Sequence, residues 1–186
     1  NHLPDTLISL DIKSAFLNQL LDKLPNSLKR LLLDLSSFEY NIDKLPVNLE
    51  TLELDSYNWP YSFDLFPKNL KNLTCICRTF NQTLNNLPET LKSLLIISDI
   101  FNQPLHSLPK SLEELDITSP NFNTSLDSLP NTLTLLSIEA SKFNPNGANY
   151  YSPTGRGVVC CLYVEELWGI TSQKIRITCS RRAFKS

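Results

Sequence analysis

The chain has 186 residues, 41% of them hydrophobic, which is enough for one domain with a buried core. Its formal net charge of −2 excludes a protein that attracts nucleic acid through its overall charge, and no apolar run approaches the ~20 residues that span a bilayer. The five cysteines are too few and too scattered for a secreted disulfide framework. We therefore expect a cytoplasmic protein that binds neither nucleic acid nor a membrane.

A repeat of 21 residues begins at the first Leu-Pro dipeptide and runs through seven units without an insertion. The fourth unit begins with Phe66-Pro67 instead. The other six begin at Leu3, Leu24, Leu45, Leu87, Leu108 and Leu129. A spacing this regular predicts a repeat solenoid, in which each unit forms one coil stacked on the last.

Each unit contains one segment with the pattern of a strand. If the first residue of the unit is position 1, position 8 is Leu in all seven units, and position 10 is Ile, Leu or, in the fourth unit, Cys75. Both positions alternate with more polar neighbours, and a period of two is typical of a strand. One short strand per unit, stacked in register, predicts a parallel β-sheet with strands ~4.8 Å apart on one face of the solenoid.

The rest of each unit predicts mostly irregular or turn structure on the other face. Position 15 is aromatic in six units, and we expect it to point inward together with the apolar residues at positions 1, 5 and 19. Pro at position 2 has no N–H and suits a corner. The Thr, Ser or Asn at position 4 is expected to hold the turn by hydrogen bonding to a nearby backbone N–H. Asn at position 16, present in five units, predicts a stacked column that satisfies backbone groups inside the coil.

Positions 7, 9 and 11 form the sheet face that the core does not use, and the candidate site lies there. Acids outnumber bases on this face, and an apolar centre of Ile76, Leu95 and Ile97 lies between the acidic stretches. An apolar patch with a charged rim is typical of a protein interface. The alternative is a solvated sheet face, on which a few aliphatic side chains need no explanation. The residues predicted to bind a protein partner are Asp34, Glu53, Asp55, Ile76, Leu95, Ile97 and Asp116.

The repeats do not predict catalysis or a cofactor. The acid pairs Glu53/Asp55 and Glu114/Asp116 imitate a carboxylate dyad, but they lie on a regular strand face. The only two histidines, at positions 2 and 106, lie at the terminus and in a turn, so no nucleophile, base and acid come together.

The pair Cys75 and Cys77 has the spacing of some metal ligands. However, Cys75 takes the inward position 10, and Cys77 takes position 12, which is small in six units. We therefore predict two buried free thiols and no metal site.

The last 37 residues differ from the repeats. Residues 1–149 hold 11 Lys and Arg against 17 Asp and Glu, a balance of −6, whereas residues 150–186 hold 6 against 2, a balance of +4. The repeat pattern ends near Asn144, so we predict a domain boundary within 145–150. Residues 158–164 are apolar and β-prone, and residues 174–179 alternate. This predicts a β-rich C-terminal cap that covers the open end of the solenoid, with Tyr163 and Trp168 packed on the last coil.

The unit pattern Leu-Pro-x-Ser/Thr-Leu-x-x-Leu-x-Ile followed by Phe-Asn resembles the FNIP repeat family, a relative of leucine-rich repeats that is abundant in social amoebae and in giant viruses of amoebae. The resemblance covers residues 1–146 or so. The Phe-Asn pair is intact in four units, but Phe38-Glu39 and Trp59-Pro60 depart from it. The family implies a leucine-rich-repeat-like protein-interaction scaffold. Some members carry an F-box before the repeats and resemble substrate receptors of ubiquitin ligases.

The chain contains no Met, so we expect it to be processed or truncated, which leaves room for a missing N-terminal domain. The resemblance therefore implies ubiquitin-ligase machinery as a partner only if such an F-box is missing from these residues. Our main hypothesis is a non-catalytic protein–protein interaction scaffold that recognises its partner with the exposed sheet face. The alternative is a structural component of an assembly such as a giant-virus particle, located in the virion and contacting its neighbours through flanks and ends.

Overall fold

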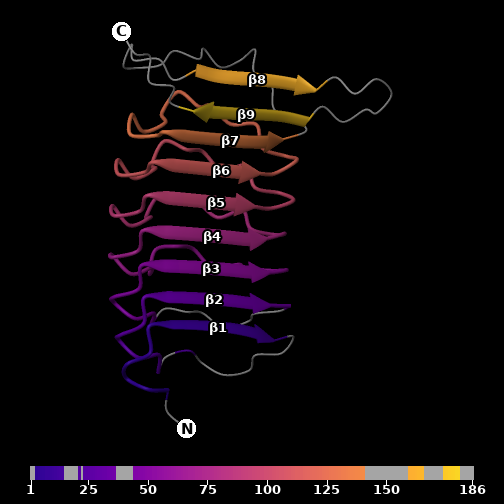
Figure 1. Cartoon of the computed structure of the whole chain (residues 1–186). Helices are drawn as coiled ribbons and strands as arrows, with labels where there is room; N and C mark the ends of the chain where they lie inside the picture. The colour runs from indigo at the N-terminus through magenta and orange to yellow at the C-terminus, as the bar shows by residue number, and fades with distance from the viewer. Residues whose placement is uncertain are drawn as a thin grey trace.

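The computed structural model describes residues 3–14, 21, 23–36 and 44–140, together with the backbone of residues 159–165 and 174–180. The predicted solenoid is confirmed (Figure 1). Its seven parallel strands are β1 (Ser9–Ser14), β2 (Arg30–Leu35), β3 (Thr51–Ser56), β4 (Asn72–Cys77), β5 (Ser93–Ile97), β6 (Glu114–Thr118) and β7 (Leu135–Ala140). None of the described segments is a helix long and apolar enough to cross a membrane.

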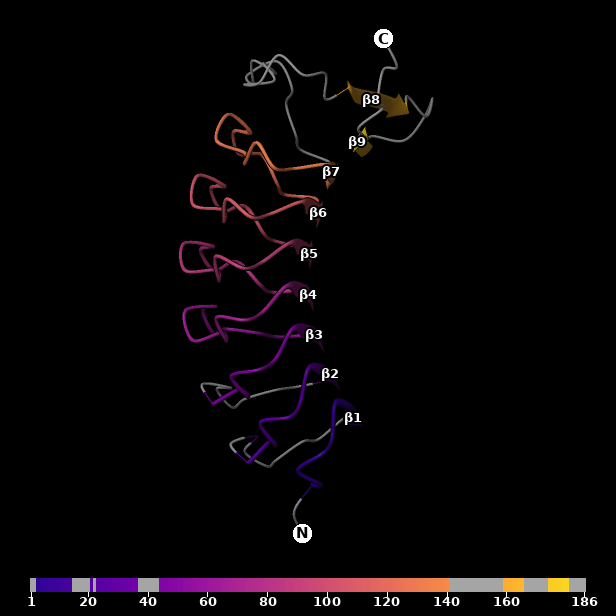
Figure 2. The ribbon, with the colours of Figure 1, turned by 60° about the vertical axis from the view of Figure 1, so that its left-hand side comes forward.

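The strands pair in the register that the repeat predicts. Leu10 lies opposite Leu31, Leu31 opposite Leu52, and Leu52 opposite Leu73, always one repeat of 21 residues further along the chain. Each strand is followed by turns and irregular chain that return along the other side of the coil, as the rotated view in Figure 2 shows. One face of the solenoid is therefore a sheet and the other is largely without regular structure.

The core lies between these two faces and is built from columns of identical or similar side chains. From the second coil onward, the leucines at positions 5 and 8 are buried, as are Cys75 and its equivalents at position 10. In the first coil Leu7, Leu10 and Ile12 are only partly buried, because no described coil packs against their outer side. The hydrophobic core is therefore continuous along the stack from β2 to β7.

Aromatic rings form a second column on the irregular side. Phe80, Phe101 and Phe122 at position 15 are fully buried and nearly parallel, with ring centroids 5.8 and 6.1 Å apart. Phe63 from position 19 extends this column, at 4.7 Å from Phe80. Stacked aromatic rings bury a large apolar area in each coil, so the column holds the irregular side without secondary structure. The equivalent residues Leu17, Phe38 and Phe143 lie outside the described residues.

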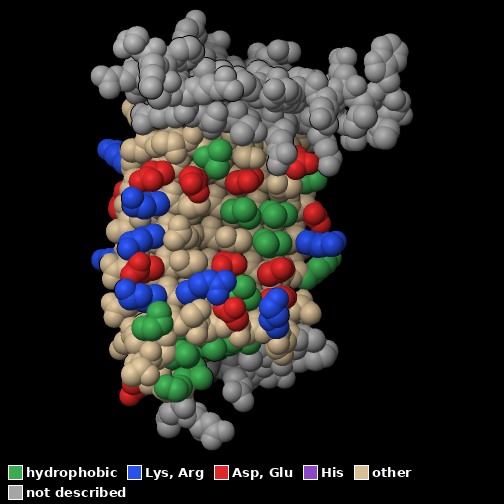
Figure 3. All heavy atoms as spheres, viewed as in Figure 1, with side chains coloured by type: hydrophobic (Ala, Val, Ile, Leu, Met, Phe, Trp, Pro, Cys, Tyr) green, Lys and Arg blue, Asp and Glu red, His purple; other side chains and the backbone are tan. Residues whose placement is uncertain are grey.

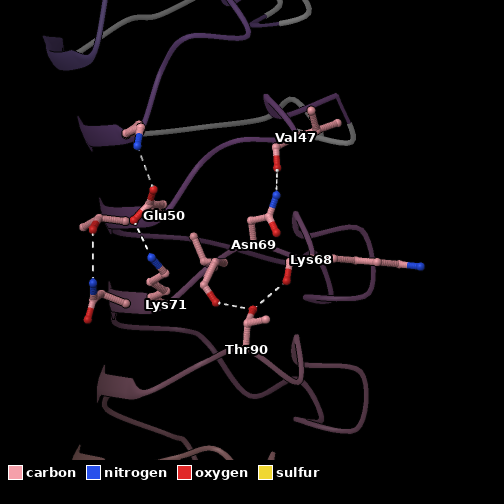
Figure 4. A network of polar contacts seen from close by, with 10 residues as sticks. Val47, Glu50, Lys68, Asn69, Lys71 and Thr90 are labelled. Carbon is pink, nitrogen blue, oxygen red and sulfur yellow. Dashed lines mark hydrogen bonds and ion pairs between the residues drawn. The ribbon is translucent and has the colours of Figure 1, made fainter.

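Polar side chains link each coil to the one before it, and here one expectation is wrong. The residues at position 4 do not bond to a backbone N–H. They donate to backbone carbonyls of the preceding coil at 2.5–2.9 Å, because those carbonyls point along the stack and have no strand partner. Figure 4 shows two of these bonds, from Asn69 to Val47 and from Thr90 to Lys68. The six donors are Ser27, Asn48, Asn69, Thr90, Ser111 and Thr132.

The Asn column at position 16 is confirmed for the described coils. The side-chain oxygen of Asn81 accepts from the backbone N–H of Asn102 at 3.0 Å, and that of Asn102 accepts from the N–H of Asn123 at 2.8 Å. Buried serines at position 12 act similarly. Ser98 Oγ donates to the carbonyl of Phe80 at 2.8 Å, and Ser119 Oγ donates to that of Phe101 at 2.9 Å. The core thus contains polar atoms only where the stacked chain satisfies them.

Two further strands, β8 (Val159–Glu165) and β9 (Lys174–Ser180), match the segments predicted for the cap. β9 pairs antiparallel with β7, and β8 pairs antiparallel with β9, so the last parallel strand is not the edge of the sheet. The side chains of both strands, the boundary within 145–150, and Trp168 lie outside the description.

Candidate interaction surface

All seven residues predicted to bind a partner lie on the outward face of the sheet. Asp34 is on β2, Glu53 and Asp55 are on β3, Ile76 is on β4, Leu95 and Ile97 are on β5, and Asp116 is on β6. The strands alternate as predicted, with positions 8 and 10 buried and positions 7, 9 and 11 accessible. The side chains of this face are brought together because the repeat places one strand beside the next in register.

The apolar patch consists of Ile76, Leu95 and Ile97. Ile76 lies directly opposite Ile97 in the register of β4 and β5, and Leu95 precedes Ile97 by two residues on the same face. Ile97 is 38% exposed, whereas its neighbour Ile96 is fully buried. Figure 3 shows hydrophobic side chains gathered over the central strands, with acidic side chains on the strands to either side. The patch is therefore a contiguous apolar area on an otherwise polar sheet face.

Not every predicted acid is available to a partner. Arg30 on β2 bridges Asp11 on β1 and Glu53 on β3, with N–O distances of 2.5 and 2.8 Å. The hydrogen bond to Glu53 raises the pKa of the Arg30 guanidinium further above its ordinary value. Lys13 pairs with Asp34 at 3.3 Å. Asp34 and Glu53 are thus already paired within the chain, so they form a self-compensated surface over β1–β3.

A second set of ion pairs, which the sequence analysis did not identify, lies at position 6 just before the strands. Glu50 accepts from Lys71 at 2.7 Å and from Lys29 at 3.1 Å, and Lys92 pairs with Glu113 at 2.8 Å. The bonds from Lys71 and then Lys29 lower the pKa of the Glu50 carboxyl. Figure 4 shows Glu50 between its two lysines. Opposite charges 21 residues apart were the signal in the sequence, because a repeat of that length stacks them.

The residues that follow the strands extend the surface, and sequence reasoning missed them. Ser56, Cys77 and Ser98 at position 12 are buried, so the next residues turn outward again. Tyr57 is 62% exposed, and Ile100 in the following coil region is 43% exposed. We call Tyr57, Arg78, Asp99 and Ile100 the strand-end rim. It could have been found by continuing the alternation past position 11.

Backbone hydrogen bonds hold this rim in line with the sheet. The N–H of Thr79 donates to the carbonyl of Tyr57 at 3.3 Å, and the N–H of Asp99 donates to the carbonyl of Arg78 at 3.0 Å. Both bonds join one coil to the next just beyond the ends of β3, β4 and β5. The rim side chains therefore stand beside the apolar patch on a backbone fixed by the stack.

The described charges near the apolar patch are largely uncompensated. Asp55 and Asp99 form no ion pair or side-chain hydrogen bond with any described residue, and the same holds for the guanidinium of Arg78. Glu114 accepts only the Ser93 hydroxyl, at 3.0 Å. Asp116 is half-buried on β6. The charges around the patch therefore have polar capacity left for a partner, unlike those over β1–β3.

The two predicted thiols are free and buried, as expected. Burial raises the pKa of the Cys75 thiol well above its ordinary value, and the neighbouring Cys77 adds to this. A raised pKa disfavours the thiolate that reacts with electrophiles and binds metals. Among the described residues no group of three or more His, Cys, Asp or Glu is placed to hold a metal ion. Chemically, the described surface is suited to binding.

Comparison with known families supports the repeat assignment. The FNIP Repeat model matches residues 80–119 and again 101–140. These two overlapping windows span the coils from Phe80 to Ala140, which include all the intact Phe-Asn pairs among the described residues. The chain thus contains FNIP repeats. No curated protein sequence matches the chain.

A solved structure supports the fold. The crystal structure of CroV588, described as a novel circular LRR protein structure and belonging to a giant virus, has a TM-score of 0.57 and is 28% identical in sequence. The similarity covers 76% of this chain and 25% of that protein, so the chain spans about a quarter of its length. The chain is similar to a leucine-rich-repeat solenoid, a scaffold-type fold.

Proposed function

We propose that this FNIP-repeat solenoid is a non-catalytic interaction scaffold, which binds a protein partner through the outward face of its sheet. Repeat solenoids of the leucine-rich type generally mediate protein interactions, which supports the coarse assignment. The observation that carries the finer one is the apolar patch. The fold requires apolar side chains only at inward positions, yet Ile76, Leu95 and Ile97 are accessible side by side on β4 and β5.

The strand-end rim adds the residue types that anchor protein interfaces. Tyr and Arg are enriched among the residues whose truncation weakens binding most. Tyr57 is largely exposed, and the Arg78 guanidinium lacks a partner among the described residues. Because backbone bonds hold both residues in place, little ordering would be required when a partner binds.

The test is a matched pair of substitutions to lysine. Ile97→Lys places a charge in the apolar patch, and we expect it to abolish binding of proteins that the unmodified chain retains from its native cells. Val47→Lys is the control, because Val47 is 64% exposed in a turn away from the patch. Both variants should melt at nearly the temperature of the unmodified chain, since neither side chain lies in the core.

The outcome also separates the two function classes. A partner lost with Ile97→Lys and kept with Val47→Lys supports the sheet-face scaffold. A partner kept with Ile97→Lys and lost with Val47→Lys, or with Arg181→Glu in the basic tail, contradicts it. That result would favour a structural component of an assembly, an alternative supported by the similarity to a giant-virus protein.

A further inference from the structure

We propose that the segment recognised by the apolar patch is basic, with an apolar side chain flanked by lysine or arginine. This inference rests on the proposed function, because it names the chemistry of the partner at the same surface. The apolar side chain covers Ile76, Leu95 and Ile97. The flanking cations reach Asp55, Asp99 and Glu114.

The first argument is the charge balance of the sheet face. Over β1–β3 the described cations Lys13 and Arg30 are used up by Asp11, Asp34 and Glu53. Just before the strands, Lys29, Lys71 and Lys92 are likewise paired with Glu50 and Glu113. Near the patch, three carboxylates without a described cation face a single unpaired guanidinium. The apolar patch therefore lies in a locally negative field, although the sheet beside it is compensated.

The second argument is the position of the three carboxylates. Asp55 lies opposite Ile76 in the register of β3 and β4, so it is one strand away from the patch. Glu114 lies opposite Ser93, on the strand β6 that follows the one carrying Leu95. Asp99 comes two residues after Ile97. Acids thus flank the patch on three sides.

The spacing fits an extended polypeptide. Neighbouring strands are ~4.8 Å apart, and residues two apart in an extended segment are ~6.6 Å apart on one face. A lysine or arginine within about two residues of an apolar anchor on the patch therefore comes within side-chain reach of Asp55 on one side and Asp99 on the other. Cations that pair with partly desolvated carboxylates add specificity and speed the encounter.

Arg78 sets a limit on the partner. Its guanidinium stands in the strand-end rim, next along the stack from Tyr57 and directly before Asp99 in the same column. A uniformly basic stretch would place a cation against it, which is unfavourable. The partner is therefore expected to offer a carboxylate or a backbone carbonyl to Arg78, so the surface selects a basic segment with an apolar anchor and rejects a simple polycation.

The experiment uses a library of random peptides displayed on phage and selected on the full chain. Peptides that also bind an Ile97→Thr variant are removed, because this change deletes apolar surface without adding charge, and Thr118 already occupies the equivalent position on β6. We expect the remaining peptides to be enriched in Lys and Arg within about two residues of an aliphatic or aromatic residue. One enriched peptide is then synthesised and titrated.

The titration compares charge changes inside and outside the patch. The double variant Asp55→Asn with Asp99→Asn should weaken peptide binding by ~10-fold or more, and added salt should reduce that difference. Glu89→Gln is the matched control, because Glu89 is exposed in a turn and its loss changes the net charge equally for one site. We expect less than about a twofold effect from this control.

Each other outcome overturns a defined part of the inference. Peptides that need Ile97 but are acidic or neutral, and that bind the Asp55→Asn, Asp99→Asn variant normally, contradict the basic class and leave the proposed function standing. Basic peptides that bind equally well to Ile97→Thr are held by general electrostatics, which also contradicts it. If no peptide depends on Ile97, the proposed function itself fails.

Discussion

The two sides of each strand differ in how much they vary from coil to coil. On the inward side, position 8 is Leu in every coil. On the outward side, position 11 carries Lys13, Asp34, Asp55, Ile76, Ile97, Thr118 and Glu139. The backbone and the register are the same for both sides. The inward side chain packs against its own equivalents in the coils above and below, so it is constrained to be constant. The outward one contacts solvent and is free to specialise.

The largest test of this contrast is access to the inward thiols. Cys75 and Cys77 should be alkylated only when the solenoid unfolds, at a rate at least about a thousandfold below that of a free thiol, since unfolding of a domain costs at least ~5 kcal/mol. The raised pKa of Cys75 acts in the same direction. Mass spectrometry of alkylated peptides, with and without urea, measures this.

Elemental analysis gives the matching result for the metal. We expect no stoichiometric zinc. Zinc at one per chain that disappears from a Cys75→Ser, Cys77→Ser variant would show that these side chains form a site and do not simply fill a core column.

The next largest effect separates two neighbours on β5. Leu94→Ala should destabilise the chain by ~2–5 kcal/mol, because Leu94 is 1% exposed and a cavity would remain. Leu95→Ala should cost less than ~1 kcal/mol, since Leu95 is on the outward face. Urea titrations of both variants measure the difference. Equal losses would contradict the distinction between the two sides.

A smaller effect is expected from a polar atom on the inward side. Ser98 Oγ donates to the carbonyls of Phe80 and Arg78 and accepts from the N–H of Ile100. Ser98→Ala removes all three bonds and should cost ~1–3 kcal/mol. Ala140 fills the same position in the last coil, so alanine fits sterically. A neutral result in chemical denaturation would mean that the ladder of buried serines does not contribute to stability.

The smallest effect belongs to an exposed ion pair. The pKa of Glu50 is lowered from 4.5 by Lys71 and then Lys29, so its contribution to stability is present above pH 4.5 and is lost as the pH falls through the folded pKa. Glu50→Gln should therefore destabilise slightly at about pH 7 and not at about pH 3. Urea midpoints at the two pH values show this, and a loss of equal size at both would assign it to the side chain and not to the charge.

The sequence predicted the inward side far better than the outward one. The count of 21 residues placed every strand from β1 to β7 and its register, because identical columns are the only way to stack such units. It also identified the apolar patch, since Ile76 and Ile97 break a polar column. It did not show that Arg30 neutralises Glu53, because pairing depends on side-chain conformations across strands. The direction of the bonds at position 4 was wrong for a similar reason: their acceptors belong to the preceding coil and not to the local turn.

The hydrogen bonds between coils have a mechanical consequence. Most join residues 18 to 23 positions apart, so each coil is tied only to its neighbours. The first and last parallel strands lie at opposite ends of the stack (Figure 1). A pull between these ends acts across the strands, so it loads the bonds of one row at a time and peels the coils off singly. Each coil would release 21 residues, ~70 Å of extended chain. Under tension the molecule should lengthen in nearly equal steps, and each released step would limit the force passed to whatever is attached at either end.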